Sequence, residues 1–213
     1  MPLRNPEETR YRLQEAAERE FARYGFAGAR VARIARAART NQRMVYHYFG
    51  GKKGLYEAIR RHASTELADR LLRTLAAKIE DDPGAAYADT LRAYFEAVCS
   101  HPTWARLVFH EALEPSPGFS TAARAPEQRF VATFEPAIRR AQAEGHLRED
   151  LTPLMGLAVA SMVSVMYPLF WREQWVRAAG RFGVGVDDPD SSFADSMLAL
   201  ILDGVRSGEP PRT

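Results

Sequence analysis

The sequence predicts an all-α fold, in which an N-terminal three-helix helix-turn-helix domain precedes a larger helical bundle. Apolar residues recur at helical spacing in most segments, and no segment shows the alternation that is typical of a strand. The first third of the chain contains three short helical segments with tight connections. We therefore expect two domains, residues 1–62 and residues 63–213.

The composition narrows the class of protein further. The chain has 213 residues, 46% of them hydrophobic, which is enough to bury a sizeable core. It has no run of about 18 purely apolar residues and a charged N-terminus, so we expect no membrane span, no secretory signal and a cytoplasmic protein. We interpret the most apolar stretch, residues 154–171, as a buried core helix. The single cysteine, Cys99, excludes an internal disulfide, and we expect no metal or cofactor.

Charge is distributed unevenly along the chain. Residues 1–62 contain 14 Arg and Lys against 6 Asp and Glu, a net charge of +8, whereas the remainder carries −6. A basic segment on an acidic body favours contact between that segment and a polyanion. A solvated charged surface explains the same numbers, so charge alone leaves both interpretations open.

The first helix is predicted from its start and stop signals. Asn5 can cap it, Pro6 suits the first helical position, and Glu8 lies three residues after the cap. Apolar residues then recur at helical spacing until Gly25, which is expected to end the helix.

Two shorter helices follow at residues 31–38 and 42–49, with Asn41 as the expected cap of the second. A glycine pair then separates them from a fourth helix, which Lys52 or Lys53 opens. Three short helices in this order describe a helix-turn-helix bundle. In such a bundle the third helix enters the major groove of DNA and the second crosses the backbone.

The rest of the chain is also expected to be helical. Asp82-Pro83-Gly84 and His101-Pro102 are expected to break it, Gly145 ends a helix, and Pro168 should kink the apolar helix. The expected helices are residues 85–100, 103–114, 126–144, 151–178 and 192–206, with loops at 115–125 and 181–191.

A specific pattern of order and spacing runs through residues 8–62. Its members are Ala16-Ala17, Phe21, Tyr24-Gly25-Phe26, Val31, Ile34-Ala35, Ala38, Met44, Tyr46-His47-Tyr48-Phe49, Lys52 and Leu55. In this pattern the chain resembles the TetR (tetracycline repressor) family of bacterial transcriptional regulators. The resemblance implies a regulator rather than an enzyme, most simply a repressor. Such a repressor binds a near-palindromic DNA operator as a homodimer and is released by a small molecule.

Two positions depart from the family pattern. The turn between the second and third helices usually contains glycine followed by a small apolar residue, but here the pair is Arg39-Thr40. Arginine at a positive φ costs on the order of 1 kcal/mol, so this turn is where we expect an unusual backbone or an extra phosphate contact. The second helix often starts with a Thr/Ser pair. Here Ala29-Arg30 replaces it, which removes a hydroxyl cap and offers a charge to phosphate.

The start of the third helix is expected to read bases. Gln42 can pair with adenine, Arg43 can pair with guanine, and Met44 can contact a thymine methyl. Arg43 as a solvated cation is the alternative. The other DNA-binding candidates are Arg30, Asn41, Tyr46, His47, Tyr48 and Lys52.

These other candidates are expected to contact phosphate. Lys52 heads the fourth helix, whose free N–H groups already favour an anion. His47 and Tyr48 can donate hydrogen bonds to the DNA backbone. Tyr46 is open between packing and phosphate contact, and Phe49 is expected in the core.

In the body, aromatic and methionine side chains recur, and we expect some of them to line a cavity for an apolar or aromatic effector. The candidates are Tyr94, Trp104, His110, Phe130, Phe134, Met162, Met166 and Phe170. Glu111 is a further candidate for orienting a polar group of the ligand. Apolar faces near residues 155–171 and 193–205 suggest a homodimer.

Two other functions are weighed against the ligand-responsive regulator. In one alternative, the body serves dimerisation only, without an effector. A helical enzyme with His110 and Glu111 as acid–base groups lacks any nucleophile motif, phosphate loop or metal spacing. Activation rather than repression also stays open.

Overall fold

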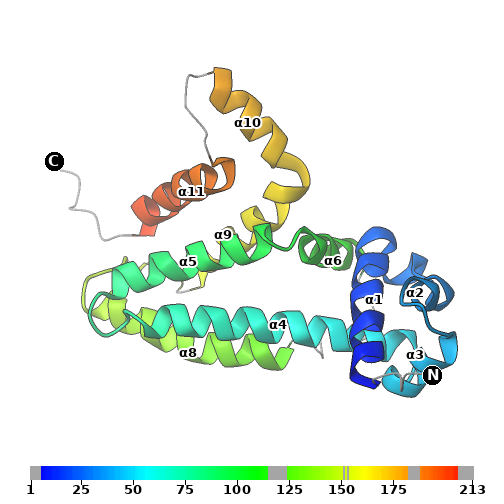
Figure 1. Cartoon of the computed structure of the whole chain (residues 1–213). Coiled ribbons are helices and arrows are strands. Elements are labelled where there is room, and N and C mark those ends of the chain that lie inside the picture. Colours follow the sequence, from blue (N-terminus) through cyan, green and yellow to red (C-terminus); the bar gives the residue numbers. More distant parts are fainter. Residues whose placement is uncertain (1–5, 115–123, 151, 153, 182–187, 206–213) are drawn as a thin grey trace. The chain divides into compact units, whose positions relative to one another are not determined.

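The computed structural model describes residues 6–114, 124–150, 152, 154–181 and 188–205, and its regular elements in these ranges are all helices (Figure 1). The predicted all-α fold is therefore confirmed. The chain forms two compact units. The first unit takes its described residues from 1–66 and 106–127, and the second takes them from 67–105 and 128–213. The expected domain boundary after residue 62 stays a prediction.

The first unit contains the helix-turn-helix segment. Its helices are α1 (Pro6–Gly28), α2 (Val31–Ala37), α3 (Gln42–Phe49) and parts of α4 (Lys52–Ala76) and α6 (Pro102–Leu113). Gly25 has φ 64° and ψ 179°, so the regular part of α1 ends there as predicted. The bounds predicted for α3 are confirmed, and α2 ends one residue earlier than predicted.

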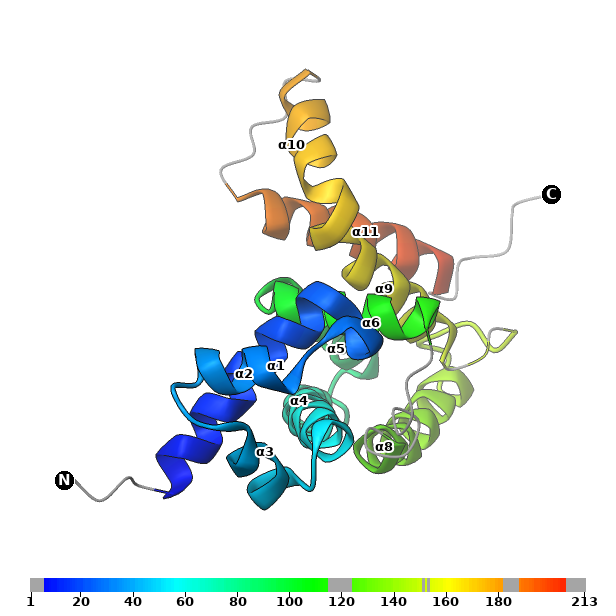
Figure 2. The same ribbon diagram turned by 90° about the vertical axis from the view of Figure 1, so that its right-hand side faces the viewer.

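A buried core joins α1 to α4 within the first unit. Phe21 of α1 packs edge-on against Tyr56 of α4 with 4.9 Å between ring centroids, and Phe26 packs against the same ring. Other fully buried members are Leu13, Ala17, Ile34, Val45 and Leu55. Only Val45 of α3 is fully buried, which leaves most of α3 accessible. Figure 2 shows α3 in a view in which α4 is close to end-on.

The second unit is built from longer helices around an aromatic core. It contains α5 (Pro83–Cys99), most of α8 (Arg124–Ala143), α9 (Met155–Met166), the π-helical turn η1 (Tyr167–Trp171), α10 (Arg172–Arg181) and α11 (Pro189–Val205). Phe134 contacts Tyr87 and Phe130, with centroids 5.8 and 5.0 Å away. Tyr167 of η1 stacks on Phe193 of α11 at 4.1 Å.

The breaks expected near Pro83 and Pro102 are confirmed, and both prolines also open the helices that follow. α5 begins at Pro83 and α6 at Pro102, because a first-turn residue needs no N–H donor. Asp82 completes the start of α5, since its carboxylate accepts a hydrogen bond from Ala85 N at 2.8 Å. Gly145, with φ 79°, follows the end of α8 as predicted. The predicted loops at 115–125 and 181–191 lie largely outside the described residues.

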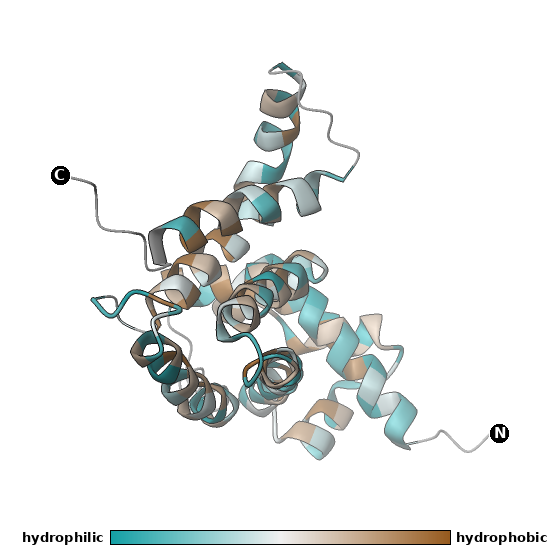
Figure 3. Cartoon of the chain, turned by 90° about the vertical axis from the view of Figure 1, so that its left-hand side faces the viewer, coloured by the Kyte–Doolittle hydropathy of each residue, from teal (hydrophilic) through white to brown (hydrophobic). Residues whose placement is uncertain are grey.

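The interpretation of residues 154–171 as a buried core helix is wrong. One side of α9 is buried through Gly156, Ala160 and Ser164. The opposite side exposes large apolar side chains, which continue into η1: Met155, Val159, Met162, Met166, Phe170 and Trp171. Figure 3 shows hydrophobic stretches on α9 and α11. The kink expected at Pro168 takes the form of the π-helical turn, since proline removes one backbone donor.

The segment Met155–Arg181 is also the one helix in the described residues that is long and apolar enough to cross a membrane, with a mean hydropathy of 1.2. This criterion is weak evidence, because core helices of water-soluble proteins satisfy it as well. The second half of the segment carries Arg172, Glu173, Arg177 and Arg181, which a lipid interior disfavours. An apolar stripe confined to one side of a helix fits a protein partner better than a bilayer.

Candidate nucleic-acid interface

Helix α3 presents a polar side of the first unit. Gln42, Arg43 and His47 are exposed, and Val45 anchors the opposite side in the core. Asn41 occupies the N-cap position as expected, but its side chain makes no capping hydrogen bond. Met44 N donates to the backbone oxygen of Asn41 at 3.1 Å, whereas no capping side chain accepts from the other first-turn N–H groups of α3, which suit an anion.

The aromatic residues of α3 divide into an exposed and a packed group. Tyr46 is 60% exposed, so the alternative that placed it in packing is wrong. Met44, Tyr48 and Phe49 are partly buried against the core of the first unit. Phe49 is thus a packing residue, although not a fully buried one. Tyr48 also packs against the core, so phosphate contact is not its only role in the prediction.

Glu20 organises the start of α2, and the sequence analysis did not identify it. Its carboxylate accepts hydrogen bonds from Arg30 N at 2.9 Å and from Arg33 Nε at 2.6 Å. Burial alone raises the pKa of Glu20, but these hydrogen bonds outweigh burial and lower it. Arg33 also lies over the ring of Tyr24 at 4.3 Å. Glu20 thus satisfies the backbone N–H of the N-cap residue Arg30, while no side chain caps the first turn of α2 itself.

Lys52 stands at the first position of α4, where the sequence places a phosphate contact. Its Nζ donates to Ala27 O at 3.2 Å and lies 4.8 Å from the centroid of Phe26. Burial lowers the pKa of Lys52, and nearby Glu20 opposes that effect. The ammonium is therefore positioned by the first unit itself and retains donors for a phosphate.

The turn between α2 and α3 has the unusual backbone that the sequence predicts. Arg39 has φ 53°, the one positive φ of a non-glycine residue in the described ranges. Its side chain is exposed and makes no hydrogen bond or ion pair with any described residue, and the same holds for the side chains of Arg30, Arg36 and Arg43. Four guanidinium groups without a carboxylate partner thus gather on α2, α3 and their flanks.

A buried ion pair in the first unit corrects the role considered for Glu111. Glu111 Oε2 lies 3.3 Å from Arg60 Nε, and both side chains are 2% exposed. The hydroxyl of Tyr56 donates to the other carboxylate oxygen of Glu111. Glu111 is therefore committed to Tyr56 and Arg60 of α4, and it does not face a ligand or a substrate.

The predicted effector residues do not meet in one cavity. Phe130 and Phe134 are buried in the core of the second unit, whereas Met162, Met166 and Phe170 are exposed on α9 and η1. His110 belongs to the first unit and packs against Gly25. The five aromatic and methionine residues were predicted because such side chains recur along the body, a pattern that core, surface and cavity positions share, whereas His110 was predicted to orient a polar group of the ligand.

Tyr94 and Trp104 do lie together. Their rings meet edge-on at 6.4 Å, and Nε1 of Trp104 is buried without a hydrogen-bond acceptor in the described residues. Such a donor is costly unless a water or a ligand accepts from it.

Two open cavities lie in the second unit among the described residues. One of about 340 Å³ has mostly aliphatic walls from α4, α5 and α8: Leu72, Leu75, Ala76, Ile79, Pro83, Pro136 and Ala137. Another of about 330 Å³ is lined by polar groups of α5, of α11 and of the residue before α11, including Arg92, Glu96, Asp190 and Asp188. None of the eight predicted effector residues lines either cavity.

These features define a helix-turn-helix protein with a basic recognition surface. The family model "Bacterial regulatory proteins, tetR family" matches residues 13–59. The HTH-type transcriptional repressor SCO4008 of Streptomyces coelicolor is 35% identical over 71% of this chain and 73% of its own length. The HTH-type transcriptional repressor NicS of Pseudomonas putida is 30% identical over 67% of this chain and 68% of its own.

A solved structure agrees. The putative transcriptional regulator SCO4942 from Streptomyces coelicolor has a TM-score of 0.71 and 26% identity, and the match covers 94% of this chain and 99% of that one. The chain belongs to the TetR family and is a DNA-binding transcriptional regulator, as its resemblance predicts. Members of this family are regulators rather than enzymes.

Proposed function

We propose that this protein is a repressor, which binds a near-palindromic operator as a homodimer and releases it when a small molecule binds the second unit. One observation carries the proposal: the exposed side of α3 and its flanks concentrates polar side chains with guanidinium groups that no carboxylate of the described residues neutralises. The names of two relatives as transcriptional repressors support repression over activation. A cytoplasmic location follows from that role.

The DNA contacts divide by chemistry. Gln42, Arg43 and Met44 at the start of α3 meet base edges, where a good bidentate pair discriminates by about 1–3 kcal/mol. Charged groups, hydroxyl groups and an imidazole near these three residues contact phosphate, and such contacts position the protein without reading sequence. These contacts come from Arg30, Asn41, Tyr46, His47, Tyr48 and Lys52. Of the ring-bearing residues, exposed Tyr46 and His47 are better placed than half-buried Tyr48.

The homodimer is proposed to form through the apolar stripe on α9 and η1 together with α11. Met162 is 70% exposed and Leu200 of α11 is 79% exposed, which is unusual for large apolar side chains. Covering such a stripe with a second copy removes apolar surface from water at roughly 25 cal/mol per Å². A two-fold dimer presents two α3 helices to two half-sites, which explains a near-palindromic operator.

The effector is proposed to be a small apolar or aromatic molecule, for which Tyr94 and Trp104 are the best supported contacts. The edge of Trp104 offers a buried donor, and the ring of Tyr94 offers an aromatic wall. Release of DNA requires that the effector bind one conformer of the protein more tightly than the other.

Selection from a pool of random-sequence duplexes tests the DNA-binding part. The expected result is enrichment of an inverted repeat whose half-sites are about 10 base pairs apart or a multiple of that spacing. Enrichment of single, unrepeated sites contradicts the symmetric dimer on DNA. Absence of any enrichment contradicts operator binding itself.

A thermal-shift screen with aromatic and apolar compounds tests the effector. A hit that raises Tm for the wild type, that raises it less for Trp104→Phe, and that releases the selected duplex supports the proposed repressor. A complete lack of hits favours the alternative, in which the second unit serves dimerisation only.

A further inference from the structure

The turn that joins α2 to α3 closes α2 with a defined pattern of hydrogen bonds. Arg39 N donates to Arg36 O at 3.1 Å, and Thr40 N donates to Ala35 O at 2.9 Å. These two bonds form a Schellman motif, in which the residue after the helix cap adopts a left-handed conformation. Arg39 is that residue, with φ 53°. Glycine is strongly favoured there because it has no Cβ to clash with the backbone.

Helix α8 ends with the same pattern but with glycine at the left-handed position. Gly145 N donates to Gln142 O at 3.0 Å, His146 N donates to Ala141 O at 2.9 Å, and Gly145 has φ 79°. The C-terminal end of α8 thus has glycine at the left-handed position, whereas the C-terminal end of α2 has arginine there. Folding alone does not explain arginine at position 39, because glycine closes an equivalent helix without strain.

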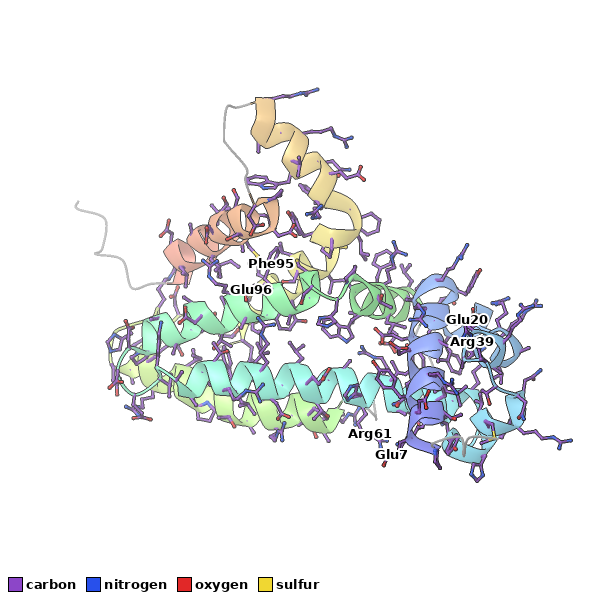
Figure 4. The ribbon with its side chains drawn as sticks, in the orientation of Figure 1. Glu7, Glu20, Arg39, Arg61, Phe95 and Glu96 are labelled. Carbon is purple, nitrogen blue, oxygen red and sulfur yellow. The ribbon has the colours of Figure 1, made fainter. Side chains whose placement is uncertain are left out.

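The side chain of Arg39 is also free of any structural task in the described residues. It is exposed and has no ion pair, hydrogen bond or ring contact, and Figure 4 labels it in the first unit together with Glu20. Arg33, six positions earlier, is engaged with Glu20 through Nε at 2.6 Å. Arg33 therefore stabilises the first unit, whereas the guanidinium group of Arg39 is available to an anion from outside the protein.

We infer that Arg39 is a further phosphate contact of the DNA interface, held beside the start of α3 by the left-handed backbone of its turn. A helix-turn-helix protein brings this turn close to the DNA backbone when α3 lies in the major groove. A guanidinium group there neutralises a phosphate without reading sequence. This contact deepens the proposed DNA binding and rests on it.

The test uses three variants of the full chain. Arg39→Gln removes the charge, Arg39→Gly removes the charge and the backbone strain, and Arg61→Gln removes an exposed charge of α4 as the matched control. Binding to a fluorescein-labelled duplex of random sequence is followed by anisotropy between about 50 and 200 mM salt. Thermal unfolding is measured for each variant.

For each Arg39 that contacts a phosphate, both variants are expected to weaken binding by about an order of magnitude near 0.1 M salt. The slope of log K against log[salt] should become less steep by about 0.9 for each such contact. Arg61→Gln is expected to leave affinity and slope unchanged. Relief of strain in Arg39→Gly is expected to raise Tm by about 2–4 °C.

Two outcomes overturn the inference while wild-type DNA binding stands. Unchanged affinity and slope in both Arg39 variants exclude the contact. A lower Tm with unchanged DNA binding indicates instead that Arg39 stabilises α2 through a favourable interaction of its charge with the C-terminal end of the helix dipole. If the wild type fails to bind the duplex at low salt, the proposed DNA binding fails first, which distinguishes the two failures.

Discussion

Helices α3 and α9 each bury one side and expose the other, but they expose opposite chemistry. The exposed side of α3 carries Gln42, Arg43 and His47, whereas that of α9 carries Met162 and Met166. Water solvates the first side well, so α3 is stable without a partner. Exposure of the second side to water is unfavourable in proportion to its apolar area, so α9 is suited to a permanent partner.

This difference predicts different responses to conditions. The DNA contacts proposed for α3 would replace counterions on phosphate, so they should weaken steeply as salt rises. The dimer contact proposed for α9 would bury apolar surface, and kosmotropic salts strengthen such burial. DNA binding and dimerisation of this protein are therefore expected to separate in a salt titration.

The largest effect is expected from a charge on the apolar side. Met162→Glu should weaken the homodimer at least a hundred-fold, since a buried charge without a partner costs about 3–5 kcal/mol. Analytical ultracentrifugation over a range of concentrations measures the dissociation constant. The matched control, Ala132→Glu on the exposed surface of α8, should leave it unchanged. A dimer that survives Met162→Glu refutes the proposed interface.

The next effect concerns the interior that supports α3. Glu111→Ala leaves Arg60 buried without its carboxylate, which should lower the free energy of unfolding by about 3–5 kcal/mol. Urea denaturation measures this loss. Glu66→Ala removes a surface partner of His62, with both side chains 69% exposed, and should change stability little. Equal losses in the two variants contradict the structural role of the buried pair.

The polar side of α3 is tested by separating base reading from phosphate binding. Arg43→Ala should cost about 1–3 kcal/mol at one position of the operator and relax the preference there. Lys52→Ala should weaken binding to all duplexes alike and reduce the salt slope by about 0.9 per contact. Competition between the selected operator and random duplexes gives both values. If Arg43→Ala weakens both duplexes equally, Arg43 is a phosphate contact.

The smallest effect comes from the buried side of α9, where Tyr87 of α5 meets Gly156. Burial raises the pKa of Tyr87 to about 12, against the effect of a backbone hydrogen bond with Gly156. Because the folded-state pKa exceeds the unfolded value of about 10, this stabilisation is complete below pH 10 and is lost as pH rises toward 12.

Urea midpoints at about pH 8 and pH 11 measure the loss, which should be about 1.4 kcal/mol smaller in Tyr87→Phe than in the wild type. The control Tyr11→Phe removes the hydroxyl of a residue that is 62% exposed and should behave like the wild type. An identical pH dependence in Tyr87→Phe and the wild type contradicts burial as the cause.

Local signals made the first unit readable from sequence. Gly25, the glycine pair after Phe49 and the helical spacing of apolar residues gave the bounds of its helices closely, because helix starts and stops depend on neighbouring residues. The backbone at Arg39 was predictable for the same reason. Glu20 was not, since it reaches Arg30 from ten residues away and nothing in its neighbourhood signals that contact.

The effector residues show where such reasoning stops. Phe134 and Met162 satisfy the same helical pattern, yet Phe134 is fully buried and Met162 is 70% exposed. Periodicity gives a residue's direction on its own helix but not which neighbour, if any, covers that direction. Only the packing of α5, α8, α9 and α11 assigns the two residues to core and surface.

The sequence by itself determined the all-α fold, the helix-turn-helix segment, the basic character of the first third of the chain and the membership of a regulator family. Each depends on short-range spacing, which the chain encodes locally. Tertiary structure alone decided that Glu111 is paired with Arg60, that Arg33 is held by Glu20 while Arg39 is free, and that α9 exposes its apolar side. These features arise where distant segments meet, and burial and pairing there depend on which surfaces the fold brings together.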